Sequence, residues 1–600
     1  MGTWTWLRSK RFAWTAFTVY LIGILSSNFY PYISTRPTGP FIDNGAVGHA
    51  FIENLSPLIG GVGVIVLMSA LVGRLWMVVL VLLPFWIALP FQWFHVLEFA
   101  QPISATTLAI VFQTNMEEAS SYLSGRTIYF SVAVGLLCVF GAIVLEATRR
   151  ADIRWRHGVR WWAASALTLL ALLCAPFRGV ALPTTALPPT ADFSDRATAQ
   201  LLRIASGMQK AYPLNLGFSI SDYIERAALA SSELEYFKKN KLSLPVIAKS
   251  RTSGKKEIYV LVIGESSRYD RWGIHDYHRD TTPRLALQKN LISFPDAVSL
   301  TSYTDTSVPI ILTAEPLSTN KTAGMRPTIM SIFREAGFRT YWLSTQPPSG
   351  FGGATFMGAL AHQADQVEFL NPVSSFTVLG QFDNSLLAPL SRILNAGEMR
   401  QFIVLHTLGS HFHYHRRYPA EYKRWSPTYE IGENPYLVST GETHIQKFNN
   451  AYDNSILYTD YVLSQIIERI RETDAAAILL YSSDHGETIY DGSCKTAGHE
   501  SLSRLNFHIP LLIWYSDKFI ASAPSFISVL YKNRKQPITT DSLYHTFLTL
   551  ARIETPYLRL QKSLASEQYM PTTRLVKTYD GRIVDFDSEL KRIDCSIASK

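Results

Sequence analysis

The sequence predicts two unlike parts, an N-terminal domain of five transmembrane helices and a C-terminal α/β/α domain built on a mostly parallel sheet. Five long apolar stretches fall within residues 1–182, whereas short apolar runs alternate with helical patterns beyond residue 255. The 600 residues are 47% hydrophobic but only 17% charged, and ordinary globular chains are about 25% charged. The mean hydropathy of +0.07 is therefore an average over two different parts.

The N-terminal stretches have the length of membrane spans. A helix needs about 20 apolar residues to cross the roughly 30 Å of bilayer hydrocarbon. The five candidates cover residues 12–30, 57–72, 75–97, 127–145 and 161–182. The first follows basic residues, as a signal peptide would, but it ends without a small-x-small cleavage site. We therefore expect a retained anchor.

Loop charges predict the orientation of the helices. Basic residues flank the first stretch and fill the loop between the fourth and fifth: Arg8, Lys10, Arg11, Arg149, Arg150, Arg154, Arg156 and Arg160. Because positive loops stay in the cytoplasm, the N-terminus is expected inside and residues beyond 182 outside. In a bacterium, the protein would lie in the inner membrane with its C-terminal domain in the periplasm.

The net charge of +8 is mainly a topology signal. Residues 1–182 carry 12 basic and 7 acidic residues, so they hold most of the excess. The remaining chain is nearly balanced and has no basic run interleaved with aromatics, so nucleic acid is not expected as a partner.

Residues 183–255 are expected to be a helical connector between the transmembrane domain, residues 1–182, and the soluble domain, residues 256–600. Amphipathic patterns cover 197–210 and 220–241. They suit either a helix lying on the membrane surface or a tether packed on the soluble domain, and the sequence leaves both open.

The soluble domain shows alternating strands and helices. Apolar strand candidates are 258–263, 340–343, 402–406, 476–481 and 509–514, with helical patterns between them, including 329–336, 455–473 and 542–553. Continuous apolar strands separated by helices indicate a parallel sheet covered on both faces. In such sheets, ligands bind beyond the carboxyl ends of the strands.

Metal-ligand residues follow three of these strands. Glu265 follows the first, Asp484 and His485 follow the fourth, and His411 follows the third after a short loop. Glutamate, aspartate and histidine supply the oxygen and nitrogen donors that Zn²⁺ accepts. Alone, Asp484 could be a helix cap and His485 a loop histidine. Together, the three strand ends predict a metal site.

A nucleophile is predicted in the hydroxyl-rich segment 300–309. A hydroxyl attacks efficiently only when a base or a metal activates it. Spacing alone does not choose among the serines and threonines, and a loop that caps the following helix is the alternative.

Several motifs in order resemble the alkaline-phosphatase/sulfatase superfamily, and most closely the bacterial phosphoethanolamine transferases that modify lipopolysaccharide. They cover most of 255–555, and the five spans followed by an external domain fit as well. The matching stretches are 262–268 (Val-Ile-Gly-Glu-Ser-Ser-Arg), 278–283 (His-Arg-Asp-Thr-Thr-Pro), 304–309 (Thr-Asp-Thr-Ser-Val-Pro), 406–411 (His-Thr-Leu-Gly-Ser-His), 452–454 (Tyr-Asp-Asn) and 483–487 (Ser-Asp-His-Gly-Glu).

The resemblance implies a role for each matching residue. Thr304 would be the nucleophile, and zinc would be bound by Glu265, Thr304, Asp484 and His485. His411 and His499 would bind the phosphate or a second zinc. In the loop 98–126, Asn115 and Glu118 would contact the donor headgroup, although a capped loop is an equal alternative. His413 and His415 are expected at the surface.

The reaction implied is a ping-pong transfer by a monomer. Thr304 would take phosphoethanolamine from phosphatidylethanolamine, and a lipopolysaccharide core sugar, lipid A or another envelope glycan would accept it. The alternatives are a phosphoglycerol transferase of the lipoteichoic-acid-synthase type and a metal-dependent phosphatase or sulfatase. No Cys/Ser-x-Pro-x-Arg setting surrounds Thr304, which counts against a sulfatase.

The cysteines depart from the lipid A branch of that family. There, cysteines flank the nucleophile segment, whereas this chain has Leu300 and Ile310. This difference favours a core-sugar or other glycan acceptor. Cys494 and Cys595 lie outside the predicted spans and could form one bridge in an oxidising compartment.

Overall fold

The computed structural model describes residues 9–29, 44–99, 102–105, 107–108, 127–155, 158–174, 211–239, 249–250, 256–314, 327–350, 353–354, 356–371, 381–430, 433, 441–491, 497–499, 502–578 and 583–593. They fall into two compact units, Met1–Ile110 with Gly125–Glu225 and Val111–Ser124 with Arg226–Lys600. The division lies inside helix α11 (Leu214–Lys239). The limits expected at 182 and 255 remain a prediction.

Each predicted apolar stretch of the first unit overlaps a helix, and residues 30 and 175–182 of these stretches lie outside the described residues. The five helices are α2 (Lys10–Ser26), α4 (Asn44–Val72), α5 (Leu75–Phe99), α8 (Thr127–Ala151) and α9 (Val159–Cys174). Leu75–Leu97 and Ile128–Ala151 are long and apolar enough to cross a membrane, and Pro57–Val72 is apolar but shorter. Two spans are thus supported among the described residues, and the number five stays a prediction.

Aromatic side chains hold α2 and α5 together. Tyr20 stacks on Trp86 with ring centroids 4.5 Å apart, and its hydroxyl donates to the carbonyl of Val79 at 3.2 Å. A hydrogen bond satisfies the buried phenol. In contrast, α8 presents Ile128, Leu136 and Val139 outward, at 75%, 67% and 61% exposure. Such an apolar face requires lipid or another apolar partner.

The second unit is built on an eight-stranded sheet in the order β13-β3-β12-β9-β2-β8-β4-β7. Its strands are β13 (Ile538–Thr539), β3 (Leu291–Val298), β12 (His508–Tyr515), β9 (Ala476–Ser483), β2 (Glu257–Gly264), β8 (Arg400–His406), β4 (Arg339–Ser344) and β7 (Gln366–Phe369). Only β12 runs against the others. The mostly parallel sheet predicted from the sequence is confirmed.

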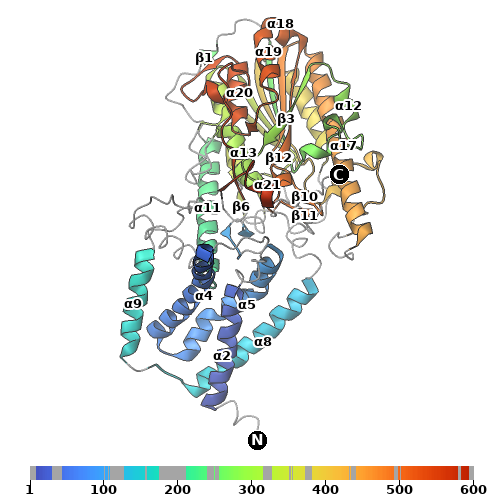
Figure 1. Ribbon diagram of the computed structural model, residues 1–600. Helices are drawn as coiled ribbons and strands as arrows, with labels where there is room; N and C mark the ends of the chain where they lie inside the picture. Colours follow the sequence, from blue (N-terminus) through green and yellow to red (C-terminus); the bar gives the residue numbers. More distant parts are fainter. Residues whose placement is uncertain are drawn as a thin grey trace. The chain divides into compact units, whose positions relative to one another are not determined.

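Helices cover both faces of this sheet (Figure 1). Residues of β2 alternate between two cores: Tyr259 and Leu261 face one, and Val260 and Val262 face the other. The first core includes α13 (Thr304–Thr313), α14 (Ile329–Glu335), α15 (Phe356–Ala361), α18 (Asp517–Ser522), α19 (Pro524–Asn533) and α20 (Ser542–Leu550). The second includes α12 (Pro283–Ala286), α16 (Leu387–Leu394) and α17 (Glu442–Glu472).

Two features differ from the sequence prediction. Strand β12, expected among the parallel strands, is antiparallel to β9. The described part of the connection between them contains the hairpin β10 (Thr488–Ile489) and β11 (Ala497–Gly498) but no covering α-helix, and parallel neighbours usually need a helical crossover. Helix α17 also begins at Glu442, before the predicted start at 455. The added segment is mostly polar and so lacks a clear apolar pattern, but its buried Phe448 and Tyr452 hold it against the domain.

Short strand pairs complete the domain: β1 (Lys249–Ser250) with β14 (Ile553–Glu554), β5 (Ser349–Gly350) with β6 (Gly353–Ala354), and β15 (Leu575–Lys577) with β16 (Ile583–Asp585). The last pair is followed by α21 (Leu590–Ile593). The β15–β16 pair follows the last strand predicted from the sequence, residues 509–514, by about 60 residues.

Candidate active site and metal centre

Two neighbouring strands deliver the predicted ligands to one edge of the sheet. Strands β2 and β9 pair in parallel with Gly264 opposite Ser483. The N–H of Asp484 still donates to the carbonyl of Gly264 at 3.0 Å. Glu265 and Asp484 therefore leave the sheet side by side, as the rule for carboxyl ends of parallel strands requires.

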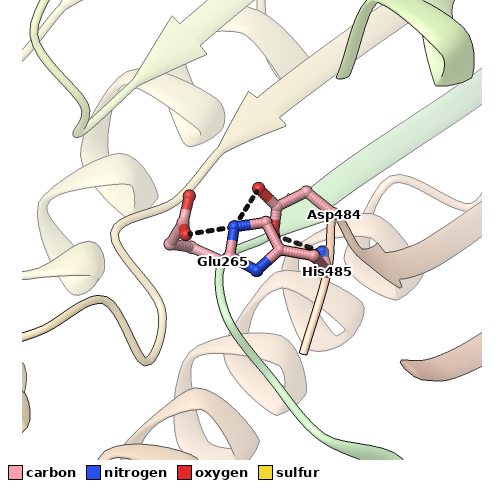
Figure 2. Close-up of side chains that lie close together, drawn as sticks. All are labelled: Glu265, Asp484 and His485. Carbon is pink, nitrogen blue, oxygen red and sulfur yellow. Dashed lines mark hydrogen bonds and ion pairs between the residues drawn. The ribbon is translucent and has the colours of Figure 1, made fainter. Parts of the chain in front are cut away.

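Glu265, Asp484 and His485 form a buried cluster (Figure 2). Their potential ligand atoms all lie within 4.8 Å of one another. The Nε2 atom of His485 is 3.4 Å from Oε1 of Glu265 and 3.5 Å from Oδ2 of Asp484. Because none of the three is more than 1% exposed, their charges are shielded little by water.

The first residue of α13 brings a hydroxyl to this cluster. Oγ1 of Thr304 lies 2.9 Å from Oε2 of Glu265 and 2.7 Å from Oδ2 of Asp484. The neighbouring hydroxyls of Thr301 and Thr306 instead bond to each other at 2.8 Å. Among the hydroxyls of segment 300–309, all of which the structure describes, only that of Thr304 contacts these carboxylates. Spacing alone did not distinguish it.

Side chains around the cluster orient its carboxylates. Oδ1 of Asp484 accepts the backbone N–H groups of Ser266 at 3.1 Å and His485 at 2.7 Å. For Glu265, Oε1 accepts the Ser266 hydroxyl and Oε2 accepts the amide of Gln346, each at 2.8 Å. Gln346 was not predicted from the sequence, although it lies shortly after a predicted strand. Its position beyond β4 is the signal that could have revealed it.

One glycine permits the close packing of these loops. Gly409 has a φ of +48°, and a Cβ there would lie only 2.8 Å from the backbone nitrogen of Glu265. The N–H of Ser410 donates to the carbonyl of Glu265 at 2.9 Å. A larger residue at 409 would push apart the two loops that carry Glu265 and His411.

The sequence and the fold match known proteins. Residues 257–553 match the sulfatase family. This stretch is a sulfatase-family domain. Phosphoethanolamine transferase EptC of Escherichia coli strain K12 is 27% identical over 510 residues, 82% of each chain. Phosphoethanolamine transferase CptA of Salmonella typhimurium is 28% identical over the same share. The family resemblance seen in the motifs is confirmed.

Solved structures agree with the fold. The C-terminal periplasmic domain of E. coli EptC in complex with Zn covers 58% of this chain and 97% of its own, at 26% identity and a TM-score of 0.52. The integral membrane phosphoethanolamine transferase EptA of Neisseria meningitidis covers 91% of this chain and 97% of its own, at 19% identity and a TM-score of 0.64. The sulfatase-family domain therefore has the expected alkaline-phosphatase-like architecture.

The cluster of Glu265, Asp484 and His485 concentrates negative charge away from water. Burial raises the pKa of Asp484 well above its usual value, and the adjacent Glu265 raises it further. Burial would also raise the pKa of Glu265, but His485, His411 and the hydrogen bonds from Ser266 and Gln346 outweigh it and lower that pKa to about 2. Burial lowers the pKa of His485, so its imidazole stays neutral. The raised pKa of Asp484 therefore favours a proton on the carboxylate pair.

This donor set fits a zinc ion. Two carboxylates, a neutral imidazole and a hydroxyl are oxygen and nitrogen ligands of the kinds that Zn²⁺ accepts. A divalent cation would offset the negative charges of the two buried carboxylates. Glu265, Thr304, Asp484 and His485 are the residues that would hold it.

Two further histidines lie near the cluster. The rings of His485 and His499 are 4.8 Å apart between centroids, and His411 lies close enough to Glu265 and His485 to lower the pKa of each. Nδ1 of His411 contacts the carbonyl of Phe412 at 2.7 Å. The structure therefore places both predicted histidines near the cluster of Glu265, Asp484 and His485.

Other predicted residues lie elsewhere. His413 and His415, expected at the surface, are buried at 5% and 6% exposure, because the aromatic rings of Phe412 and Tyr429 pack against them. That expectation was wrong. Asn115, Glu118, Cys494 and Cys595 lie outside the described residues, so the donor-headgroup contacts and the disulfide stay predictions.

Proposed function

We propose that this protein transfers phosphoethanolamine from phosphatidylethanolamine to a lipopolysaccharide acceptor, either a core sugar or lipid A, or to another envelope glycan. The observation that carries the proposal is the position of Oγ1 of Thr304, within 2.9 Å of two buried carboxylates beside the neutral ring of His485. Relatives named phosphoethanolamine transferases over 82% of the chain support the group transferred.

In the first half-reaction, Oγ1 of Thr304 attacks phosphorus and forms a new P–O bond. The hydroxyl proton passes to the adjacent carboxylate pair, and the P–O bond to diacylglycerol breaks. His411 or His499 gives a proton to the departing oxygen. The product is a phosphoethanolamine ester of Thr304.

In the second half-reaction, an acceptor hydroxyl or phosphate oxygen attacks the same phosphorus, and the bond to Oγ1 of Thr304 breaks. The histidine that lost its proton takes one from an attacking hydroxyl, and Thr304 regains its own. Zinc bound by Glu265, Thr304, Asp484 and His485 would lower the pKa of the threonine hydroxyl and offset charge on the phosphoryl oxygens. One such ion is sufficient for these roles, and His411 with His499 could hold a second.

The membrane helices complete the proposal. A catalytic domain tethered at the periplasmic face of the inner membrane meets lipid substrates at high effective concentration. The outward apolar face of α8 supports a membrane environment, and we expect the enzyme to act as a monomer. Residues 1–182, 183–255 and 256–600 would serve as anchor, connector and catalytic domain.

Mass spectrometry of lipopolysaccharide from cells with and without the protein tests this function. We expect a mass increment of one phosphoethanolamine, and fragmentation of the product identifies the acceptor. A phosphoglycerol increment would instead identify a transferase of the lipoteichoic-acid-synthase type. Release of free phosphate or sulfate without any increment would identify a hydrolase.

A further inference from the structure

The hairpin formed by β15 and β16 lies outside the sulfatase-family match, which ends at residue 553. It nevertheless pairs with the segment that leads into the nucleophile. The N–H of Lys577 donates to the carbonyl of Leu300 at 2.8 Å, and Thr301 and Lys577 form a parallel bridge. The hydroxyl of Tyr303 donates to the carbonyl of Thr578 at 3.3 Å. The contacts end one residue before Thr304.

The hairpin is itself firmly held. Val576, Val584, Phe586 and Leu590 form a separate core with Val298 and Phe507, and every member is at most 3% exposed. Arg574 is 4% exposed and pairs with Asp296 and Asp587. Because Asp296 and Val298 belong to β3, the hairpin is fixed to the central sheet.

The opposite side of the same segment touches the metal centre. The hydroxyl of Ser299 donates to the carbonyl of Asp484 at 2.5 Å, and the N–H of Ser299 donates to the carbonyl of Phe507 at 2.8 Å. Residues 299–303 thus run between the Asp484 loop on one side and the C-terminal hairpin on the other. Any sideways shift of this segment would move the start of α13, where Thr304 lies.

We propose that the C-terminal hairpin is a positioning element of the active site, which holds Leu300–Tyr303 so that Oγ1 of Thr304 stays against Glu265 and Asp484. The proposal rests on Thr304 as the nucleophile. Lys577 acts through its backbone N–H, and Tyr303 acts through its hydroxyl. Since neither belongs to the loops that carry Glu265, Asp484 and His485, these three of the four proposed zinc ligands stay in place without the hairpin contacts. The hairpin is therefore expected to affect the attack by Thr304 more than zinc binding.

Proline at 577 tests the backbone contact, because proline has no N–H to donate. In the full-length, zinc-loaded protein, we expect Lys577→Pro to lower kcat at least about tenfold, since small displacements of reacting groups are costly. KM and bound zinc, measured by metal analysis, should stay within about twofold of the wild-type values. Thr572→Pro is the matched control: Thr572 is exposed and its N–H has no acceptor among the described residues, so its kcat should be unchanged.

Tyr303→Phe keeps the ring and removes only the hydroxyl contact. We expect about a fivefold lower kcat, the size of one lost hydrogen bond, with unchanged zinc content. This variant decides the question if the proline variant fails to fold. Wild-type kcat in Tyr303→Phe, or equal losses of zinc and activity in Lys577→Pro, would overturn the positioning role.

Thr304→Ala separates this proposal from the proposed function. If Thr304→Ala loses transfer while both hairpin variants keep it, the hairpin proposal fails and the nucleophile stands. If Thr304→Ala retains transfer, the nucleophile assignment itself fails.

Discussion

The helical unit and the sheet domain are both rich in apolar residues, yet they place them in opposite ways. In α8, Ile128 and Leu136 point outward at 75% and 67% exposure. In β2, all eight residues are buried. Charges differ as well: Arg149 and Arg150 lie at the end of α8, whereas Glu265 and Asp484 are buried at strand ends.

This difference shows how similar apolar residues are arranged for lipid in one unit and for water in the other. A lipid-facing helix exposes apolar side chains and keeps charge at its ends. A sheet domain in water hides its apolar strands and buries charge only where ion pairs, hydrogen bonds or a metal compensate it. The buried carboxylates of the sheet domain therefore indicate a functional site, and the exposed apolar face of α8 indicates contact with lipid. Point substitutions can test each of these two interpretations.

The largest effect is expected at the nucleophile. Thr304→Ala should reduce transfer by at least about 1,000-fold, as losses of catalytic nucleophiles do, and should abolish the phosphorylated-threonine peptide seen by mass spectrometry. Unfolding midpoints should stay close to wild type. Thr313→Ala is the control, because this threonine belongs to the same helix and its hydroxyl donates to the carbonyl of Pro309, away from the carboxylates. Full transfer by Thr304→Ala would show that the buried carboxylates mark something other than this chemistry.

Metal removal should make the free energy of unfolding depend on the protonation of the buried carboxylates. In the zinc-free protein, Asp484 has a raised pKa in the folded state, so the folded state keeps a proton that the unfolded state loses above about pH 4. Stability should therefore fall as pH rises from about 4 toward the folded pKa. Asp484→Asn removes this contribution, so its unfolding free energy in chelator should depend less on pH between 5 and 8.

Asp460 supplies a background for that comparison. Burial raises its pKa to about 7, so it makes stability fall with pH over the same range in both proteins. Only the difference between wild type and Asp484→Asn reports on the metal centre. Identical slopes in urea titrations of the two zinc-free proteins would contradict the raised pKa of Asp484.

The sequence alone predicts the parts of the domain that depend on local pattern. Apolar runs predict β2, β8 and β9, and the strand-end rule places Glu265, Asp484 and His485 at one edge. The direction of β12 depends on a connection without a described helix, and the contact of Gln346 depends on side-chain geometry. The pairing of Lys577 with Leu300 joins residues 277 positions apart, and nothing in either segment specifies its partner.

Gln346 should show an intermediate effect. Its amide donates to Oε2 of Glu265 at 2.8 Å and to the carbonyl of Thr407 at 3.0 Å. Gln346→Leu removes the donor that orients Glu265, a proposed metal ligand, and such losses typically weaken metal binding by about 10–100-fold. Competition with a fluorescent zinc chelator measures the change. Gln381→Leu, on an exposed side chain, is the control, and equal zinc affinity in both variants would exclude an orienting role.

The smallest effect is predicted for exposed apolar residues, which we expect to face lipid in α8 and water in the sheet domain. Leu136 of α8 and Leu287 of the sheet domain are 67% and 85% exposed, so a purely soluble protein should tolerate lysine at either position. If α8 faces lipid, Leu136→Lys places a charge within a span, at a cost of roughly 2.5–3.5 kcal/mol for insertion, whereas Leu287→Lys faces water. We expect a several-fold lower recovery of Leu136→Lys in washed membranes and unchanged recovery of Leu287→Lys. Equal recovery of both variants would mean that the exposed face of α8 meets something other than lipid.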